Sequence, residues 1–182
     1  MNLTGQQHLP VSQAQAWAAL NDTAMLQAAV PGCEALTSTG DNAFDLLMAV
    51  SIGPVKARFK GKLQLSELTP PLSYRIGFEG SGGAAGHGKG QAFVQLQAVS
   101  PSETVLSYDV TASVGGKVAQ IGSRLVDAAA QKLAQDFFIR LQAALVERHP
   151  PAAAPALAAS AAPAERRHAL QRLRAWLRRW FG

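Results

Sequence analysis

The sequence predicts an α+β fold in which an antiparallel sheet packs against one long C-terminal helix. Residues 116–149 contain no proline, and their apolar side chains recur three or four positions apart, which is the helical period. Between residues 34 and 114, apolar residues instead alternate with polar ones, as in strands that bury one face. Short turns rather than crossover helices separate these segments, so we expect up to seven antiparallel strands.

The N-terminal segment predicts one strand followed by two short helices. Residues 3–9 alternate weakly and suit a first strand. Ser12 can cap the first helix, and Asp22 or Thr23 can cap the second. Residues 30–32, which read Val-Pro-Gly, end the second helix.

A hairpin of residues 44–52 and 55–65, joined at Gly53-Pro54, is the clearest strand signal. Cations alternate with apolar residues in its second arm, at Lys56, Arg58, Lys60 and Lys62. Such alternation is typical of a solvated sheet face that resists edge pairing. The alternative is a cationic face that approaches a membrane or an acidic partner.

Further strands are expected at residues 74–78, 92–98 and 106–112, before the long helix. This helix should run from residue 116 to residue 149, because Pro150 and Pro151 stop it. Gly122 lies inside the helical pattern and weakens it by about 1 kcal/mol relative to alanine. A close approach of another backbone, or an opening beside the helix, would explain this glycine.

Charge divides the chain into a neutral body and a basic tail. Residues 1–149 hold 11 basic and 11 acidic side chains, whereas the remainder adds six arginines and one glutamate. We expect a folded domain at residues 1–149, an Ala/Pro spacer at 150–164 and an amphipathic basic helix at 165–182. A nucleic-acid-binding body would carry its own basic surface, so nucleic acid is not an expected partner.

The tail has the composition of a helix that lies on a membrane surface. Arginines attract an anionic leaflet, at about 1 kcal/mol per charge near the surface, while Trp and Leu side chains bury at the headgroup boundary. The predicted membrane-binding residues are Arg166, Arg167, Leu170, Arg172, Leu173, Arg174, Trp176, Leu177, Arg178, Arg179, Trp180 and Phe181. Docking on a partner protein and a solvated tail are the alternatives.

Neither a signal-peptide pattern at the N-terminus nor a run of about 20 apolar residues is present in the sequence. We therefore expect a cytoplasmic protein held peripherally on the inner face of the cell membrane.

Candidates for catalysis or metal binding are few. Cys33 is the only cysteine, and the four histidines, His8, His87, His149 and His168, show no ligand spacing. The glycine-rich residues 80–90 lead into a strand rather than a helix, which argues against a phosphate-binding loop. We expect no catalytic residue and no metal site, and a flexible hairpin at residues 80–90 whose role in gating a cavity is open.

Five segments together resemble the CoxG family of carbon monoxide dehydrogenase subunits, within the START-like (SRPBCC), helix-grip superfamily. They are residues 17–22, 30–34, 53–61, 80–90 and 115–125, and they occur in the family's order across roughly residues 1–148. The resemblance implies a helix-grip fold, a curved antiparallel sheet of six to seven strands around the C-terminal helix, enclosing an apolar cavity.

The same resemblance implies a non-enzymatic accessory protein of a molybdenum-containing hydroxylase of the CO dehydrogenase type. Its ligand would be a lipophilic molecule such as a quinone, with no covalently bound cofactor. The residues expected to line the cavity are Trp17, Phe44, Met48, Phe59, Phe78, Tyr108, Leu125 and Phe137. One alternative is a pure recruitment or assembly factor with a solid core.

A third interpretation is a helix-grip enzyme that acts on a polyketide or aromatic substrate. It would need ionisable groups inside the cavity, for which the chief candidates are Asp109, Tyr108 and His87.

Overall fold

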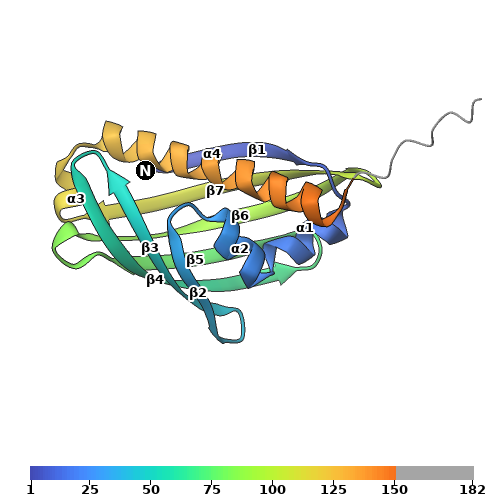
Figure 1. Ribbon diagram of the computed structural model, residues 1–182, viewed down its shortest axis with the longest axis horizontal. Helices are drawn as coiled ribbons and strands as arrows, with labels where there is room; N and C mark the ends of the chain where they lie inside the picture. The colour runs from blue at the N-terminus through green and yellow to red at the C-terminus, as the bar shows by residue number, and fades with distance from the viewer. Residues whose placement is uncertain (151–182) are drawn as a thin grey trace, which may run out of the picture. The chain divides into compact units, whose positions relative to one another are not determined.

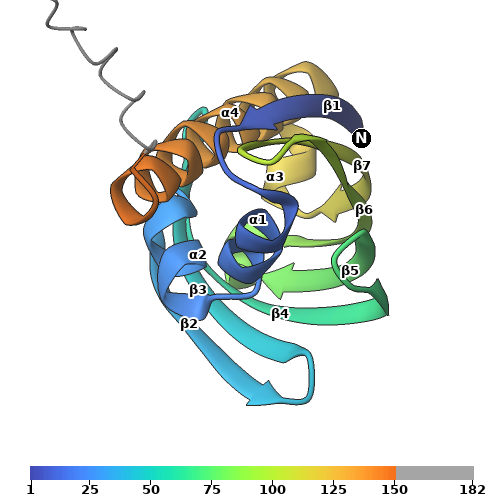
Figure 2. The same ribbon diagram turned by 90° about the vertical axis from the view of Figure 1, so that its right-hand side faces the viewer.

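One antiparallel sheet of seven strands curves around a long helix, α4 (Figures 1 and 2). The computed structural model describes residues 1–150. The strand order is β1-β7-β6-β5-β4-β3-β2, so β2 to β7 form a continuous meander and β1 pairs with β7. The strands are β1 (Asn2–Leu9), β2 (Cys33–Gly40), β3 (Ala43–Ile52), β4 (Val55–Thr69), β5 (Ser73–Ser81), β6 (His87–Ser100) and β7 (Glu103–Gly115). The predicted helix-grip fold is confirmed.

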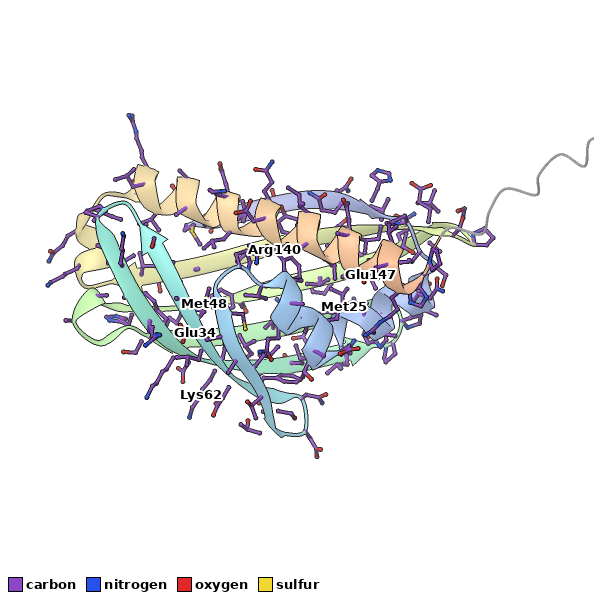
Figure 3. All side chains as sticks on the ribbon, in the orientation of Figure 1. Met25, Glu34, Met48, Lys62, Arg140 and Glu147 are labelled. Carbon is purple, nitrogen blue, oxygen red and sulfur yellow. The ribbon has the colours of Figure 1, made fainter. Side chains whose placement is uncertain are left out.

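The hairpin of β3 and β4 forms as predicted, with Ile52 paired to Val55 across Gly53-Pro54. Apolar side chains of β4 lie on the inner face of the sheet, which faces α4, and the alternating cations lie exposed on the outer face. Figure 3 shows Lys62 pointing away from the helix side. Because the side-chain period of a strand is two, this register places Phe44, Leu46 and Met48 on the face of the apolar β4 residues, while Leu47 lies opposite Lys60 on the outer face.

Two short helices, α1 (Gln13–Leu20) and α2 (Thr23–Ala29), follow β1 and begin at the predicted caps. The Ser12 side chain accepts from the backbone N–H of Gln15, and the Gln15 side chain accepts from the Ser12 N–H, which completes a capping box. Asp22 accepts from the N–H groups of Ala24 and Met25. Both helices pack inside the curve of the sheet (Figure 2).

The predicted continuous helix from residue 116 is wrong, because the segment contains two helices, α3 (Lys117–Gln120) and α4 (Ser123–Arg148). Gly116 and Gly122 adopt φ angles of 77° and 97°, which interrupt a helix and which glycine tolerates best. A Cβ at Gly122 would meet nothing within 4 Å, so no backbone approaches it. This glycine therefore marks the start of α4, and the helix of 26 residues is about 39 Å long.

The core of the domain lies beneath the C-terminal half of α4. Its fully buried side chains are Leu9, Val11, Leu96, Thr104, Leu106, Leu141 and Leu145. Polar contacts close this end: Arg148 donates to Asp22 over 2.6 Å, and Gln142 donates to the His8 carbonyl over 2.7 Å. Within residues 123–137 of α4, by contrast, Val126 alone is buried. The C-terminal half of α4 is thus packed closely into the core, and its N-terminal half is packed less closely.

No helix within residues 1–150 is long and apolar enough to cross a membrane. Most of the predicted spacer, the predicted basic helix at 165–182 and His168 lie outside the described residues.

Candidate ligand-binding cavity

Two apolar cavities lie in series between α4 and the inner face of the sheet. The inner cavity, of about 200 Å³, lies next to the packed core. The rim cavity, of about 280 Å³, lies toward the end where α4 begins. Leu46 and Leu63 line both cavities, so the two spaces share a wall of two leucine side chains.

Aromatic side chains form the closed end of the inner cavity. Tyr108 stacks on Phe138 with ring centroids 5.2 Å apart, and Phe137 packs edge-on against Phe138 at 5.1 Å. Tyr74 also lines this cavity and has only 3% of its surface exposed. Burial raises the pKa of Tyr74, so its hydroxyl stays protonated at neutral pH and keeps an O–H donor.

A row of glycines forms the floor of the rim cavity. Gly61 of β4 pairs with Gly80 of β5, and Gly80 pairs with Gly88 of β6. All three line the rim cavity, and they occupy the inward-facing positions that carry apolar side chains elsewhere in these strands. The cavity exists because three adjacent strands present no side chain there.

The rim cavity is otherwise walled by apolar side chains from five elements. Met48 and Ile52 come from β3, Phe59 from β4 and Val114 from β7, while Val118 of α3 and Leu133 of α4 cover the space. Glu79 and His87 also border the cavity, but both are exposed, and the Glu79 side chain lies on the outer face opposite Lys62 and Lys89. The arrangement suits an apolar molecule that reaches the cavity from this end.

Six of the eight residues predicted to line a cavity do so. Phe44, Tyr108 and Phe137 line the inner cavity, and Met48, Phe59 and Phe78 line the rim cavity.

The other two predicted residues lie elsewhere. Trp17 packs edge-on against Tyr74, with ring centroids 5.4 Å apart, and belongs to the surroundings of the core. Leu125 is 49% exposed, because α4 begins only at Ser123 and its first turn lies beside the β3–β4 turn. Leu125 therefore lines neither of the two cavities.

Sequence reasoning missed the shared leucines and the glycine row. Leu46 and Leu63 look like any other apolar strand residue in the sequence. The glycines did carry a signal, since Gly61, Gly80 and Gly88 each stand at an inward-facing position of an alternating strand.

The three ionisable candidates for an enzymatic role do not meet in the cavities. Asp109 is exposed on the outer face, because it follows the inward-facing Tyr108 in β7. His87 is exposed at the start of β6, while Tyr108 lines the inner cavity.

Metal-ligating groups do not cluster in the part of the chain that the structure describes: residues 1–150 hold no set of three or more His, Cys, Asp or Glu side chains able to bind an ion. Burial raises the pKa of the half-buried Cys33 thiol, which disfavours the reactive thiolate.

A further hollow, of about 910 Å³, is an open groove on the outer face of the sheet. Charges of opposite sign alternate across its strands, with Asp45 opposite Lys62, Lys62 opposite Glu79, and Glu79 opposite Lys89. Arg58 of the β4 stripe likewise pairs with Glu34 at 3.0 Å. This balance favours a solvated sheet face, so we place the candidate site in the two apolar cavities.

Most of the glycine-rich stretch belongs to strands β5 and β6. The connection between them is residues 82–86, which include the short 3₁₀ helix η1 (Gly83–Ala85). A Cβ at Gly86 would collide with the Gly115 carbonyl, so this connection packs directly on the backbone that leads into α3. Its gating role stays a prediction.

Comparison with solved structures places the fold among START-like proteins. A conserved protein from Geobacillus kaustophilus is 28% identical, with a TM-score of 0.76 over 81% of this chain and 96% of that one. A START superfamily protein from Mycobacterium smegmatis is 12% identical, with a TM-score of 0.63 over 81% and 98%. The ZhuI aromatase/cyclase from Streptomyces sp. R1128 is also 12% identical, with a TM-score of 0.59 over 81% and 94%.

A search of curated proteins finds no match to this sequence. The family model for CoxG, a subunit of carbon monoxide dehydrogenase, matches residues 5–146, a range that contains α4 up to its last turn and all the strands that line both cavities. This chain therefore belongs to the CoxG family of carbon monoxide dehydrogenase subunits.

Proposed function

We propose that this protein is a non-enzymatic accessory protein that carries a lipophilic ligand beneath α4. The apolar lining of the two cavities in series carries the proposal. Apolar side chains line nearly all of both cavities, and Tyr74 and Tyr108 are the residues with a polar group that line the inner one. Burying an unpaired polar ligand here would cost several kcal/mol, whereas an apolar one gains about 25 cal/mol per Å² of covered surface.

The shape of the space favours an elongated molecule with a small polar head. Each cavity is smaller than the roughly 300 Å³ of common small-molecule sites, but the two share the wall formed by Leu46 and Leu63. Rotation of these leucines would join them. The protonated Tyr74 hydroxyl offers a donor for a carbonyl at the deep end. A quinone with an apolar tail has this chemistry.

Family membership supports a partnership with a molybdenum-containing hydroxylase of the CO dehydrogenase type. The basic, Trp-rich residues 165–182 support attachment of the protein to the cytoplasmic side of an anionic membrane. In this scheme the ligand shuttles between the membrane and the hydroxylase, and the tail keeps the carrier near its lipid source.

A second candidate is an assembly or recruitment factor that carries no ligand. The small volume of each separate cavity favours it. An enzymatic role has less support, because Asp109, Tyr108 and His87 lie on different faces or ends of the sheet.

Mass spectrometry of an organic extract from purified full-length protein distinguishes carrier from assembly factor. We expect an isoprenoid quinone or another lipid at a substantial fraction of the protein concentration. Gly80→Val combined with Gly88→Val places side chains in the rim cavity and should reduce the extracted ligand, whereas Gly77→Val on the outer face of β5 should not. If no lipid can be extracted from the wild-type protein and the protein does not take up added ubiquinone, the carrier function is refuted and the assembly role remains.

A further inference from the structure

The end of the domain at which the rim cavity opens carries an exposed patch that is both apolar and cationic. The β3–β4 turn, the β5–β6 connection, α3 and the first turn of α4 lie together at this end, opposite the C-terminus of α4 (Figure 1). A Cβ at Gly53 would lie 3.7 Å from Leu125 Cδ1, which joins the turn to the helix. We call the exposed residues of this end the rim patch: Pro54, Lys56, Val114, Lys117, Arg124 and Leu125.

The apolar part of the rim patch borders the cavity. Val114 is 37% exposed and also lines the rim cavity, while Leu125 is 49% exposed on the first turn of α4. Ile52, which lines the same cavity, lies beside the exposed Pro54 in the β3–β4 turn. Apolar surface therefore continues from the interior to the outside of the protein.

The cations of the rim patch have no acidic partner within residues 1–150. None of Lys56, Lys117 and Arg124 forms an ion pair there, whereas Glu79 lies opposite Lys89 on the neighbouring strand. The N-terminus of α4 has no side-chain cap, and the helix dipole adds positive potential at the same end. Asp127, which is half-buried, is the acidic residue of this part of α4.

The opposite end of the domain carries matched charges. There Asp22 pairs with Arg148, Glu67 with Arg75, and Glu103 lies 2.8 Å from His8, while Glu147 on the last turn of α4 adds a negative charge (Figure 3). Residues 1–149 are neutral as a whole, and the cations of the rim patch form no ion pair within the described residues, whereas Arg75 and Arg148 at the opposite end are paired. Such a charge distribution orients a protein at an anionic surface.

We propose that the rim patch docks on an anionic lipid bilayer, so that the rim cavity opens toward the acyl chains. The proposal rests on the carrier function above and adds a second membrane contact, made by the folded domain itself. Lys56, Lys117 and Arg124 bind lipid phosphates, and Leu125, Pro54 and Val114 enter the headgroup boundary. A lipophilic ligand then leaves the bilayer without crossing water.

A fluorescent reporter on the full-length chain tests this contact. Cys33→Ser removes the single native cysteine, and Leu125→Cys then takes an environment-sensitive NBD label. The matched reporter is Ile139→Cys, since Ile139 is 58% exposed on the same helix, about 21 Å farther along. Vesicles contain phosphatidylcholine alone or with phosphatidylglycerol, and co-sedimentation measures total binding in parallel.

We expect a blue shift and a severalfold rise in NBD emission at position 125 on anionic vesicles, with little change at position 139. Lys117→Glu with Arg124→Glu should weaken the vesicle binding reported at position 125 by at least about thirtyfold, because two cations are lost and two anions are added at the surface. Lys132→Glu with Arg140→Glu makes the same change of charge on α4 outside the rim patch, and should leave the response in place.

Each other outcome overturns the proposal. If the protein sediments with anionic vesicles but neither reporter responds, the rim does not dock and the tail alone binds. If both reporters respond, the helix lies flat on the bilayer. A response at position 125 that grows with protein concentration without vesicles identifies a second copy as the occupant. Ligand found in the organic extract would uphold the carrier function in all three cases.

Discussion

Replacing Gly80 and Gly88 with alanine should stabilise the empty domain and at the same time weaken ligand binding. Both residues are in strands and face the rim cavity. A Cβ at Gly80 would lie 3.4 Å from the Lys60 carbonyl oxygen, and one at Gly88 would lie 3.6 Å from that of Ser113. Neither contact requires movement, and neither glycine has a positive φ.

The expected gain comes from the unfolded chain, which loses conformational freedom when glycine becomes alanine. Each substitution is worth about 0.4–1 kcal/mol, so the pair should add about 1–2 kcal/mol to the free energy of unfolding. With a urea m-value of about 2 kcal/mol per molar, the unfolding midpoint should rise by about 0.5–1 M. The two new methyl groups also occupy ligand space.

Gly77→Ala is the matched control, because Gly77 lies on the outer face of β5 with its nearest neighbour 3.9 Å from the added Cβ. It should raise stability by a similar amount and leave ligand uptake unchanged. Urea unfolding and native mass spectrometry with added ubiquinone measure the two effects. If the Gly80 and Gly88 variants destabilise the protein, or bind ligand as wild type does, the rim cavity is not the ligand space we infer.

Other expectations address the core, the caps, the glycine contact and the tail. Leu141→Ala, in the fully buried core, should cost about 3–5 kcal/mol in urea unfolding, but Leu63→Ala only about 1–2 kcal/mol because Leu63 borders existing space; equal costs would contradict the cavities. A hydrogen bond from Arg148 holds the pKa of Asp22 below its ordinary value of 3.8, so this carboxylate stabilises the fold above about pH 4 and loses that effect as pH falls through its folded pKa. The free energy of unfolding of Asp22→Asn should therefore depend less on pH in that range than that of the wild type. If both proteins show the same pH dependence, the pairing is refuted. Gly86→Ala, at φ 123° against the Gly115 carbonyl, should lower stability by about 2–4 kcal/mol in thermal unfolding, and a neutral effect would contradict that contact. Deleting residues 165–182 should reduce co-sedimentation with anionic vesicles to the level left by the rim patch, and full retention would exclude the tail as an anchor.

The sequence predicted the sheet well because its signal is local. The alternation of apolar and polar residues in 44–65 predicted both the hairpin and the face of the sheet on which its side chains lie. Ser12 and Asp22 indicated where the two short helices begin, because their side chains accept hydrogen bonds from the first turn of each helix. The break at Gly122 was misread, because a glycine within a helical pattern can indicate either tolerance or a boundary. Its positive φ distinguishes the two, and φ is absent from the sequence.

The site was predictable only in part, because cavity lining depends on what faces each residue across the sheet. Phe78 and Trp17 are both aromatic residues at apolar positions, yet one meets empty space and the other meets Tyr74. The glycine row arises from the register of β4, β5 and β6, which brings three distant positions together. Single-strand periodicity contains no information on that register.

The difference in packing between the two halves of α4 determines which part of the helix can separate from the sheet. We expect the amides of Phe138 to Leu145 to exchange with solvent only through global unfolding, and those of the first three turns of α4 to exchange through smaller, local fluctuations, because the buried side chains of the helix concentrate in its C-terminal half. Under the proposed carrier function, a ligand would enter while the leucine-rich core beneath the last turns of α4 stays intact. On this expectation the N-terminal half of α4 moves away from the sheet while Leu141 and Leu145 hold the C-terminal half in the core.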